Sequence, residues 1–98
     1  MDKFDYIIVG AGAAGCVLAN RLSADPSIKV ALLEAGPSDN HPFIRMPKGL
    51  AKIMADPKYL WLYQSDPEEA NAHTSEPWVR GRVLGGSTSV NGMMYVRG

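Results

Sequence analysis

Residues 6–19 read YIIVGAGAAGCVLA, a run of fourteen residues without a single charge. Residues 4–9 are rich in aromatic and β-branched side chains and are followed by a glycine, which predicts a short buried strand. From Ala13 to Leu22 apolar residues recur at helical spacing, and Asp25-Pro26 is expected to end that helix. A second strand-length apolar run covers residues 28–33. The order strand, turn, helix, strand predicts an α/β fold built on a parallel βαβ unit.

The composition excludes several classes of function. Ten lysines and arginines balance ten aspartates and glutamates among 98 residues, so no general affinity for nucleic acid or anionic surfaces is expected. The uncharged run is shorter than the roughly 20 apolar residues of a membrane-spanning helix. The opening MDKFD lacks the positive start of an export signal, and the single cysteine, Cys16, cannot form an internal disulfide. We therefore expect a cytoplasmic protein with no membrane segment and no metal site.

Three glycines form the pattern G-x-G-x-x-G between the first predicted strand and the helix. Gly10 permits a tight turn, Gly12 leaves room for a pyrophosphate beside the backbone, and Gly15 lets the helix pack closely on the strands. Ala13 and Ala14 are small, and the helix start there offers unpaired N–H groups and the positive end of its dipole. The pattern predicts a site for the diphosphate of a dinucleotide.

Glu34 ends the second predicted strand, nineteen residues after Gly15. That spacing is typical of the acid that accepts hydrogen bonds from the ribose hydroxyls of a bound dinucleotide. A carboxylate there repels a 2′-phosphate, so the site should prefer NAD or FAD. The competing interpretation is a purely structural glycine turn followed by a solvated glutamate.

The middle of the chain is less regular. Residues 35–42 predict a loop from their glycine, proline, serine and asparagine content. Residues 47–56 predict a short helix, and residues 59–63 a strand. Residues 65–77 are polar and acidic and predict a surface loop.

A second motif lies in residues 81–98, which read GRVLGGSTSVNGMMYVRG. It resembles the first signature of the glucose–methanol–choline (GMC) oxidoreductases, a family of FAD-dependent alcohol oxidases and dehydrogenases. The glycine turn near the N-terminus also resembles the dinucleotide fingerprint of two-domain flavoproteins. The positions that match the family signature are Gly81, Arg82, Leu84, Gly85, Gly86, Ser87, Thr88, Val90, Asn91, Tyr95 and Gly98.

The resemblance implies that the bound dinucleotide is FAD, with its ADP half on the glycine turn and Glu34. It implies that backbone groups of the second motif line the isoalloxazine ring. Arg82 would face the pyrophosphate or form a surface ion pair, and Ser87 or Ser89 would cap a short helix. Trp78 stands where some members attach the flavin to a histidine, so non-covalent FAD is expected. The residues expected to bind the cofactor in this motif are Arg82, Val83, Leu84, Gly85, Gly86, Ser87, Asn91, Gly92 and Met93.

The activity implied by the family is oxidation of the CH–OH group of a small-molecule alcohol by hydride transfer to flavin. The family's catalytic base comes from near the C-terminus of a much longer chain, so neither His41 nor His73 is assigned a catalytic role. Residues 1–98 are expected to be the N-terminal part of an FAD-binding domain that needs the remainder of the protein, covalently linked or associated. The alternatives are a nucleotide-binding or interaction module without chemistry, a segment of an NAD-dependent dehydrogenase, or a lyase or light-driven enzyme of the same family.

Overall fold

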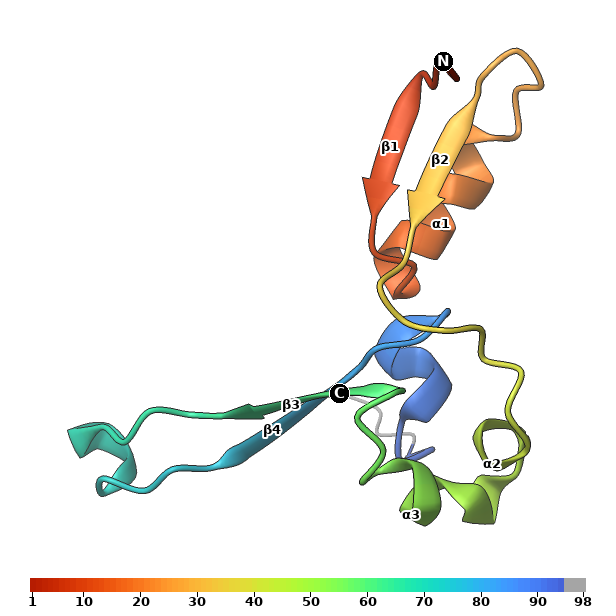
Figure 1. Ribbon diagram of the computed structural model, residues 1–98. Helices are drawn as coiled ribbons and strands as arrows, with labels where there is room; N and C mark the ends of the chain where they lie inside the picture. The colour runs from red at the N-terminus through yellow and green to blue at the C-terminus, as the bar shows by residue number, and fades with distance from the viewer. Residues whose placement is uncertain (95–98) are drawn as a thin grey trace.

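The computed structural model describes residues 1–94 as a mixed α/β chain, drawn in Figure 1. Strand β1 (Tyr6–Val9), helix α1 (Ala13–Leu22) and strand β2 (Val30–Leu33) follow one another at the N-terminus. The two strands pair in parallel, with Tyr6 opposite Val30 and Val9 opposite Leu33. The predicted strand–helix–strand order is therefore present. Two positions of the second motif, Tyr95 and Gly98, lie outside the described residues.

Helix α1 ends earlier than its sequence pattern predicted, at Leu22 rather than beside Asp25-Pro26. The carboxylate of Asp25 accepts hydrogen bonds from the backbone N–H and the hydroxyl of Ser27, at 2.9 and 2.7 Å. This local turn competes with the helix for the backbone, because a short acidic side chain satisfies the N–H groups that follow it. The turn then leads the chain back into β2.

Helix α1 covers one face of the two-stranded sheet. Ile8 points toward the helix, since its side chain lies 3.3 Å from where a Cβ on Gly15 would stand. Successive side chains of a strand alternate between faces, so Ile7 and Val9 point the other way. They are 64% and 84% exposed. A parallel pair with one bare apolar face is unusual, because parallel strands are normally buried on both sides.

Short helical turns occupy the segment after the sheet: α2 (Pro42–Arg45), η1 (Pro47–Gly49) and α3 (Leu50–Ile53). The predicted helix over residues 47–56 is thus divided into a 3₁₀ turn and one α-helical turn. Helix α2 was not predicted; its start is capped by His41, whose Nδ1 accepts a hydrogen bond from the Phe43 N–H at 3.0 Å. A Cβ on Gly49 would run into the Phe43 backbone, which explains how the turns stack so closely.

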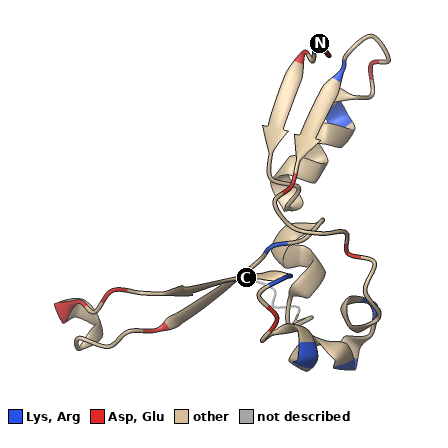
Figure 2. Cartoon of the chain, in the orientation of Figure 1, with Lys and Arg blue, Asp and Glu red and all other residues tan. Residues whose placement is uncertain are grey.

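Strands β3 (Leu60–Gln64) and β4 (Pro77–Gly81) form an antiparallel hairpin that projects from the rest of the chain in Figure 1. Strand β3 confirms the predicted strand over residues 59–63. Strand β4 starts where the predicted surface loop was expected to end. The connection carries a 3₁₀ turn, η2 (Glu69–Asn71), and Figure 2 shows acidic residues gathered toward this far end of the hairpin.

A small hydrophobic core joins the hairpin base to the helical turns and to a last 3₁₀ helix, η3 (Gly86–Val90). Its buried members are Ile53, Tyr59, Leu60, Val83 and Val90. The radius of gyration is 16.8 Å, against about 13 Å for a compact domain of this length. Within residues 1–94, none of the helices has the length and apolar character needed to cross a lipid bilayer.

Candidate functional site

The glycine turn between β1 and α1 has the backbone geometry that its three glycines allow. Gly10 adopts φ +96°, a left-handed conformation that glycine takes without the steric cost a side chain would add. A Cβ on Gly15 would collide with the carbonyl oxygen of Gly10, so only glycine brings the helix start this close to the turn. The first helical hydrogen bond runs from the Cys16 N–H to the Gly12 carbonyl, at 2.9 Å.

The start of α1 is open toward solvent and suited to an anion. Gly12 is the N-cap residue and supplies no side-chain cap, and the first turn contains no acidic residue. The N–H groups ahead of Cys16 have no acceptor within the helix, and the helix dipole adds positive potential at this end. A Cβ on Gly12 would meet no atom within 4 Å. The protein's own packing therefore does not require glycine here, and the space beside Gly12 is large enough for a diphosphate to approach the backbone.

The second motif packs directly on this turn, more than seventy residues further along the chain. The Gly85 N–H donates to the carbonyl of Ala11 at 2.7 Å. Gly86, at φ +60°, lies so close that a Cβ on it would stand 2.9 Å from the Cα of Gly12. Gly85 and Gly86 therefore bring the backbone of the second motif into direct contact with the glycine turn.

The loop after β2 joins the same cluster. The Glu34 carboxylate accepts hydrogen bonds from the backbone N–H groups of Ala11 and Gly36, each at 2.9 Å. The Leu84 N–H donates to the Pro37 carbonyl, also at 2.9 Å. Two amides thus fix the half-buried carboxylate, and its remaining lone pairs are free to accept from hydroxyl groups.

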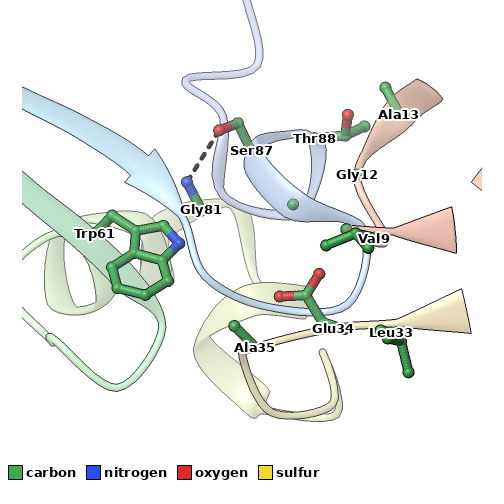
Figure 3. A pocket seen from close by; sticks show the side chains of 12 residues that line it. Val9, Gly12, Ala13, Leu33, Glu34, Ala35, Trp61, Gly81, Ser87 and Thr88 are labelled. Atoms are coloured by element: carbon green, nitrogen blue, oxygen red, sulfur yellow. Dashed lines mark hydrogen bonds between the residues drawn. The ribbon is translucent and has the colours of Figure 1, made fainter. Parts of the chain in front are cut away.

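These three segments and the base of the hairpin line an open pocket of about 640 Å³, shown in Figure 3. Figure 3 shows the Glu34 carboxylate between the glycine turn on one side and Trp61 on the other. Sequence reasoning placed six of the lining residues in the site and missed the rest, including the aromatic wall Trp61. The lining residues are Val9, Gly10, Gly12, Ala13, Leu33, Glu34, Ala35, Trp61, Gly81, Gly86, Ser87 and Thr88.

Helix η3 separates this pocket from a second one of about 260 Å³, and Thr88 lines both. Asn91 and Met93, two predicted site residues, line the second pocket. The Asn91 side chain donates to the Thr88 carbonyl at 2.8 Å and accepts from the Met93 N–H at 2.9 Å. It thereby holds Met93 in a left-handed conformation with φ +58°.

Several predicted site residues lie behind the pocket walls. Val83 is fully buried in the hydrophobic core, and its carbonyl accepts from the Gly86 N–H at 2.7 Å. The remaining predicted residues are absent from the lining of both pockets. These residues are Ala14, Gly15, Arg82, Leu84, Gly85 and Gly92.

The serines of the second motif do not cap η3, contrary to the prediction. Gly85 occupies the N-cap position, and no side chain caps the helix. The Ser87 hydroxyl instead accepts from the Gly81 N–H at 2.9 Å, and the Ser89 hydroxyl donates to the Leu84 carbonyl at 2.8 Å. Both serines tie η3 back to the strand and turn that precede it, because those neighbouring backbone groups lie within reach of a short side chain.

Arg82 and Trp78 each take part in a cation–π pair. The Arg82 guanidinium lies over the ring of Trp61, with its central carbon 4.8 Å from the ring centroid. Its buried Nε has no hydrogen-bond partner among the described residues. Trp78 lies in β4 with Arg80 above its ring, and neither pocket includes it among its lining residues.

Comparison with known proteins places this arrangement in a family. The family model for GMC oxidoreductases matches residues 4–98. The chain is 57% identical to an alcohol dehydrogenase [acceptor] of Pseudomonas putida and 56% identical to an oxygen-dependent choline dehydrogenase of Photobacterium profundum, each over 95 residues. These alignments cover 97% of this chain and 17% of each relative.

A solved structure gives the same result. Pyridoxine 4-oxidase from Mesorbium loti superposes with a TM-score of 0.86 and 38% identity, over 98% of this chain and 19% of that one. The sequence match covers nearly the whole chain and includes both glycine motifs that meet at the pocket. The chain belongs to the GMC oxidoreductase family.

Proposed function

We propose that this chain is the N-terminal, Rossmann-like part of an FAD-binding domain, and that the protein containing it oxidises a small-molecule alcohol by hydride transfer to flavin. The observation that carries the proposal is the direct contact between the two glycine motifs around one pocket. Gly85 is hydrogen-bonded to Ala11, and Gly86 packs against Gly12. A structural glycine turn would need neither the space beside Gly12 nor a carboxylate fixed at the pocket wall.

The described residues fit an adenine dinucleotide. The uncapped start of α1 offers N–H donors for a diphosphate, and Gly12 leaves room for it. The Glu34 carboxylate has spare acceptors for ribose hydroxyls, and its charge disfavours a 2′-phosphate. The segment around η3, with Asn91 and Met93 behind it, would hold the flavin end without a covalent bond.

The chemistry divides between the cofactor and the protein. Bound flavin supplies the hydride acceptor that the reaction needs. The residues of this chain bind the dinucleotide and orient it. The described residues include no candidate for the base that removes the alcohol proton, so we place that base in the remainder of the protein.

Two further observations support an incomplete domain. The chain spans 17% of the length of the curated relatives it matches. Ile7 and Val9 on the open sheet face, and Val17 and Leu18 on α1, are all more than half exposed. Large contiguous apolar surfaces normally mark a site of contact with other protein. We infer that the remaining protein, covalent or associated, covers them.

An alcohol is the substrate class that the relatives support, because two of them are named for alcohol and for choline. The test is the absorption spectrum of the native protein that carries these residues, together with chromatography of the cofactor that acid releases. The proposal predicts flavin absorption and free FAD in the supernatant. A colourless protein that releases NAD would replace FAD with a nicotinamide cofactor, and flavin retained on the precipitated polypeptide would contradict non-covalent binding.

A further inference from the structure

The half-buried ring of His41 joins helix α2 to the small hydrophobic core. Its Nδ1 accepts the Phe43 N–H at 3.0 Å, so this nitrogen carries a lone pair and no proton. The imidazole centroid lies 5.3 Å from that of the Phe43 ring and 5.2 Å from that of the Tyr59 ring, which it meets edge-on. Tyr59 is a buried member of the core. The cap and the core contact thus use one side chain, and the cap requires its neutral form.

Helix α2 has few other means of staying folded. It is a single turn of four residues, and in Figure 1 it lies beside α3, away from the parallel sheet. Pro42, at its start, has no N–H to offer, so the Phe43 N–H is the first helical donor that needs an acceptor. The His41 carbonyl serves the next two donors, the N–H groups of Ile44 and Arg45, at 3.0 and 3.3 Å. A short helix of this kind depends strongly on its cap, because one turn gains little from its own hydrogen bonds.

The residues that this cap holds form one wall of the second pocket. Phe43 and Ile44 line it, and both pack against the core that contains Val90 of η3. Asn91 and Met93, which we assign to the flavin end of the site, line the same pocket. A movement of α2 would therefore reach the segment proposed to hold the flavin end.

The charged groups around His41 are mainly cations. The Lys52 ammonium lies 5.4 Å from the centroid of the Phe43 ring, and the Lys58 ammonium lies 5.5 Å from that of the Tyr59 ring. The other charged side chains on the segments packed against the imidazole belong to Asp39, Arg45 and Asp56. Within residues 1–94, no carboxylate is hydrogen-bonded to the imidazole. A proton gained by this ring would therefore meet no bound counter-charge.

We propose that His41 is a pH-dependent positioning residue, which holds α2 and the wall of the second pocket while neutral and releases them when protonated. Histidine is the side chain that ordinarily changes charge between about pH 5 and 8. A proton taken from solvent onto Nδ1 occupies the lone pair that accepts the Phe43 N–H, and both ring nitrogens of the cation are then donors. The cap is thus present at the higher pH and is lost as pH falls. Its effect on the flavin end rests on the proposed function.

Hydrogen exchange at the Phe43 amide of the flavin-free native protein tests the cap itself. The protection of this amide, corrected for the pH dependence of an unstructured amide, should fall between about pH 8 and about pH 5. The expected fall is about 2- to 30-fold, which corresponds to loss of a helix cap. His41→Asn keeps an acceptor at the cap but does not titrate, so its protection should stay high at both pH values. His41→Ser, a second cap that does not titrate, should behave in the same way, whereas His41→Ala should lose protection at both.

Titration with FMN and with ADP tests the connection to the flavin end. FMN carries the flavin ring, whereas ADP carries the end assigned to the glycine turn. On acidification, the affinity for FMN should fall up to about 30-fold further in the wild type than in His41→Asn, the limit set by the cap. The affinity for ADP should show the same pH dependence in both proteins. His73→Asn is the matched control, because His73 is exposed near the far end of the hairpin and should leave the wild-type pH dependence unchanged.

The outcomes separate this inference from the proposed function. If the flavin-free wild type takes up no FAD at any pH, the proposed function fails, and hydrogen exchange still decides whether His41 is the cap. If Phe43 protection has the same pH dependence in the wild type and in His41→Asn, the role of His41 is wrong and the proposed function stands. If protection depends on His41 but the affinity for FMN does not, the connection between α2 and the flavin end is wrong.

Discussion

Gly86→Ala is the substitution that tests most sharply how the two motifs are joined. Gly86 has φ +60°, and a Cβ on it would stand 2.9 Å from the Cα of Gly12. The atom it meets belongs to backbone, which cannot rotate out of the way as a side chain would. The turn and η3 would have to separate, which would strain the hydrogen bond from Gly85 to Ala11.

Two costs add to give the expected magnitude. The left-handed conformation costs an L-residue roughly 1–2 kcal/mol. Forcing a methyl group into a well-packed contact costs about 1–3 kcal/mol. The free energy of unfolding should therefore fall by about 2–5 kcal/mol, a large part of the roughly 5–15 kcal/mol that a typical domain has.

Denaturant unfolding of the flavin-free native protein measures this difference. The matched control is Gly92→Ala in the same motif, because a Cβ on Gly92 would meet no atom within 4 Å and its φ is not left-handed. Gly92→Ala should change the unfolding free energy by less than about 0.5 kcal/mol. Equal stabilities of the Gly86→Ala and Gly92→Ala proteins would refute the proposed contact between the motifs.

Three other substitutions test the site and its surroundings. Gly12→Ala should change the free energy of unfolding of the flavin-free protein by less than about 0.5 kcal/mol. It should weaken the affinity for FAD about tenfold or more, which corresponds to roughly 1.4 kcal/mol per factor of ten. Titration of the wild type and the variant with FAD checks this, and equal affinities would contradict the diphosphate site. Glu34→Gln turns an amide N–H₂ toward Ala11 or Gly36 and should lower the unfolding free energy by about 1–3 kcal/mol; unchanged denaturation would count against the two carboxylate hydrogen bonds. The hydrogen bonds from Ser27 lower the pKa of Asp25. The stability that they give the turn is therefore present above the ordinary carboxyl pKa and is lost as pH falls through the lowered pKa. Hydrogen exchange at the Ser27 amide should show this acid dependence in the wild type, and the same dependence in Asp25→Asn would refute the role of the Asp25 carboxylate.

The N-terminal half of the fold could be predicted because its signals are local. The change from strand to helix period falls at the glycines, and the two strands pair in parallel as a crossover requires. The position of Glu34 at the end of β2 followed from the same reasoning. Here each residue's conformation depends mainly on neighbours a few positions away.

The remainder depends on contacts between distant segments. Strand β4 forms because Pro77 to Gly81 pair with β3 across a long connection, and the polar composition of that connection suggested only a loop. Trp61 joins the pocket because the hairpin base is carried back to Glu34 by the packing of Gly36 against Arg82. No local sequence pattern predicts either contact. The contact of Arg82 with Trp61 was not predicted for the same reason, since the two residues lie twenty-one positions apart in the sequence.

The central claim is that two glycine motifs, distant in sequence, form one wall of an FAD site. The most direct measurement is an experimental density map of the native protein saturated with FAD. We predict dinucleotide density with the diphosphate beside Gly12, the ribose at Glu34 and the flavin end along η3. FAD bound at another place in the protein, with the space beside Gly12 and Gly86 empty at saturation, would contradict the account.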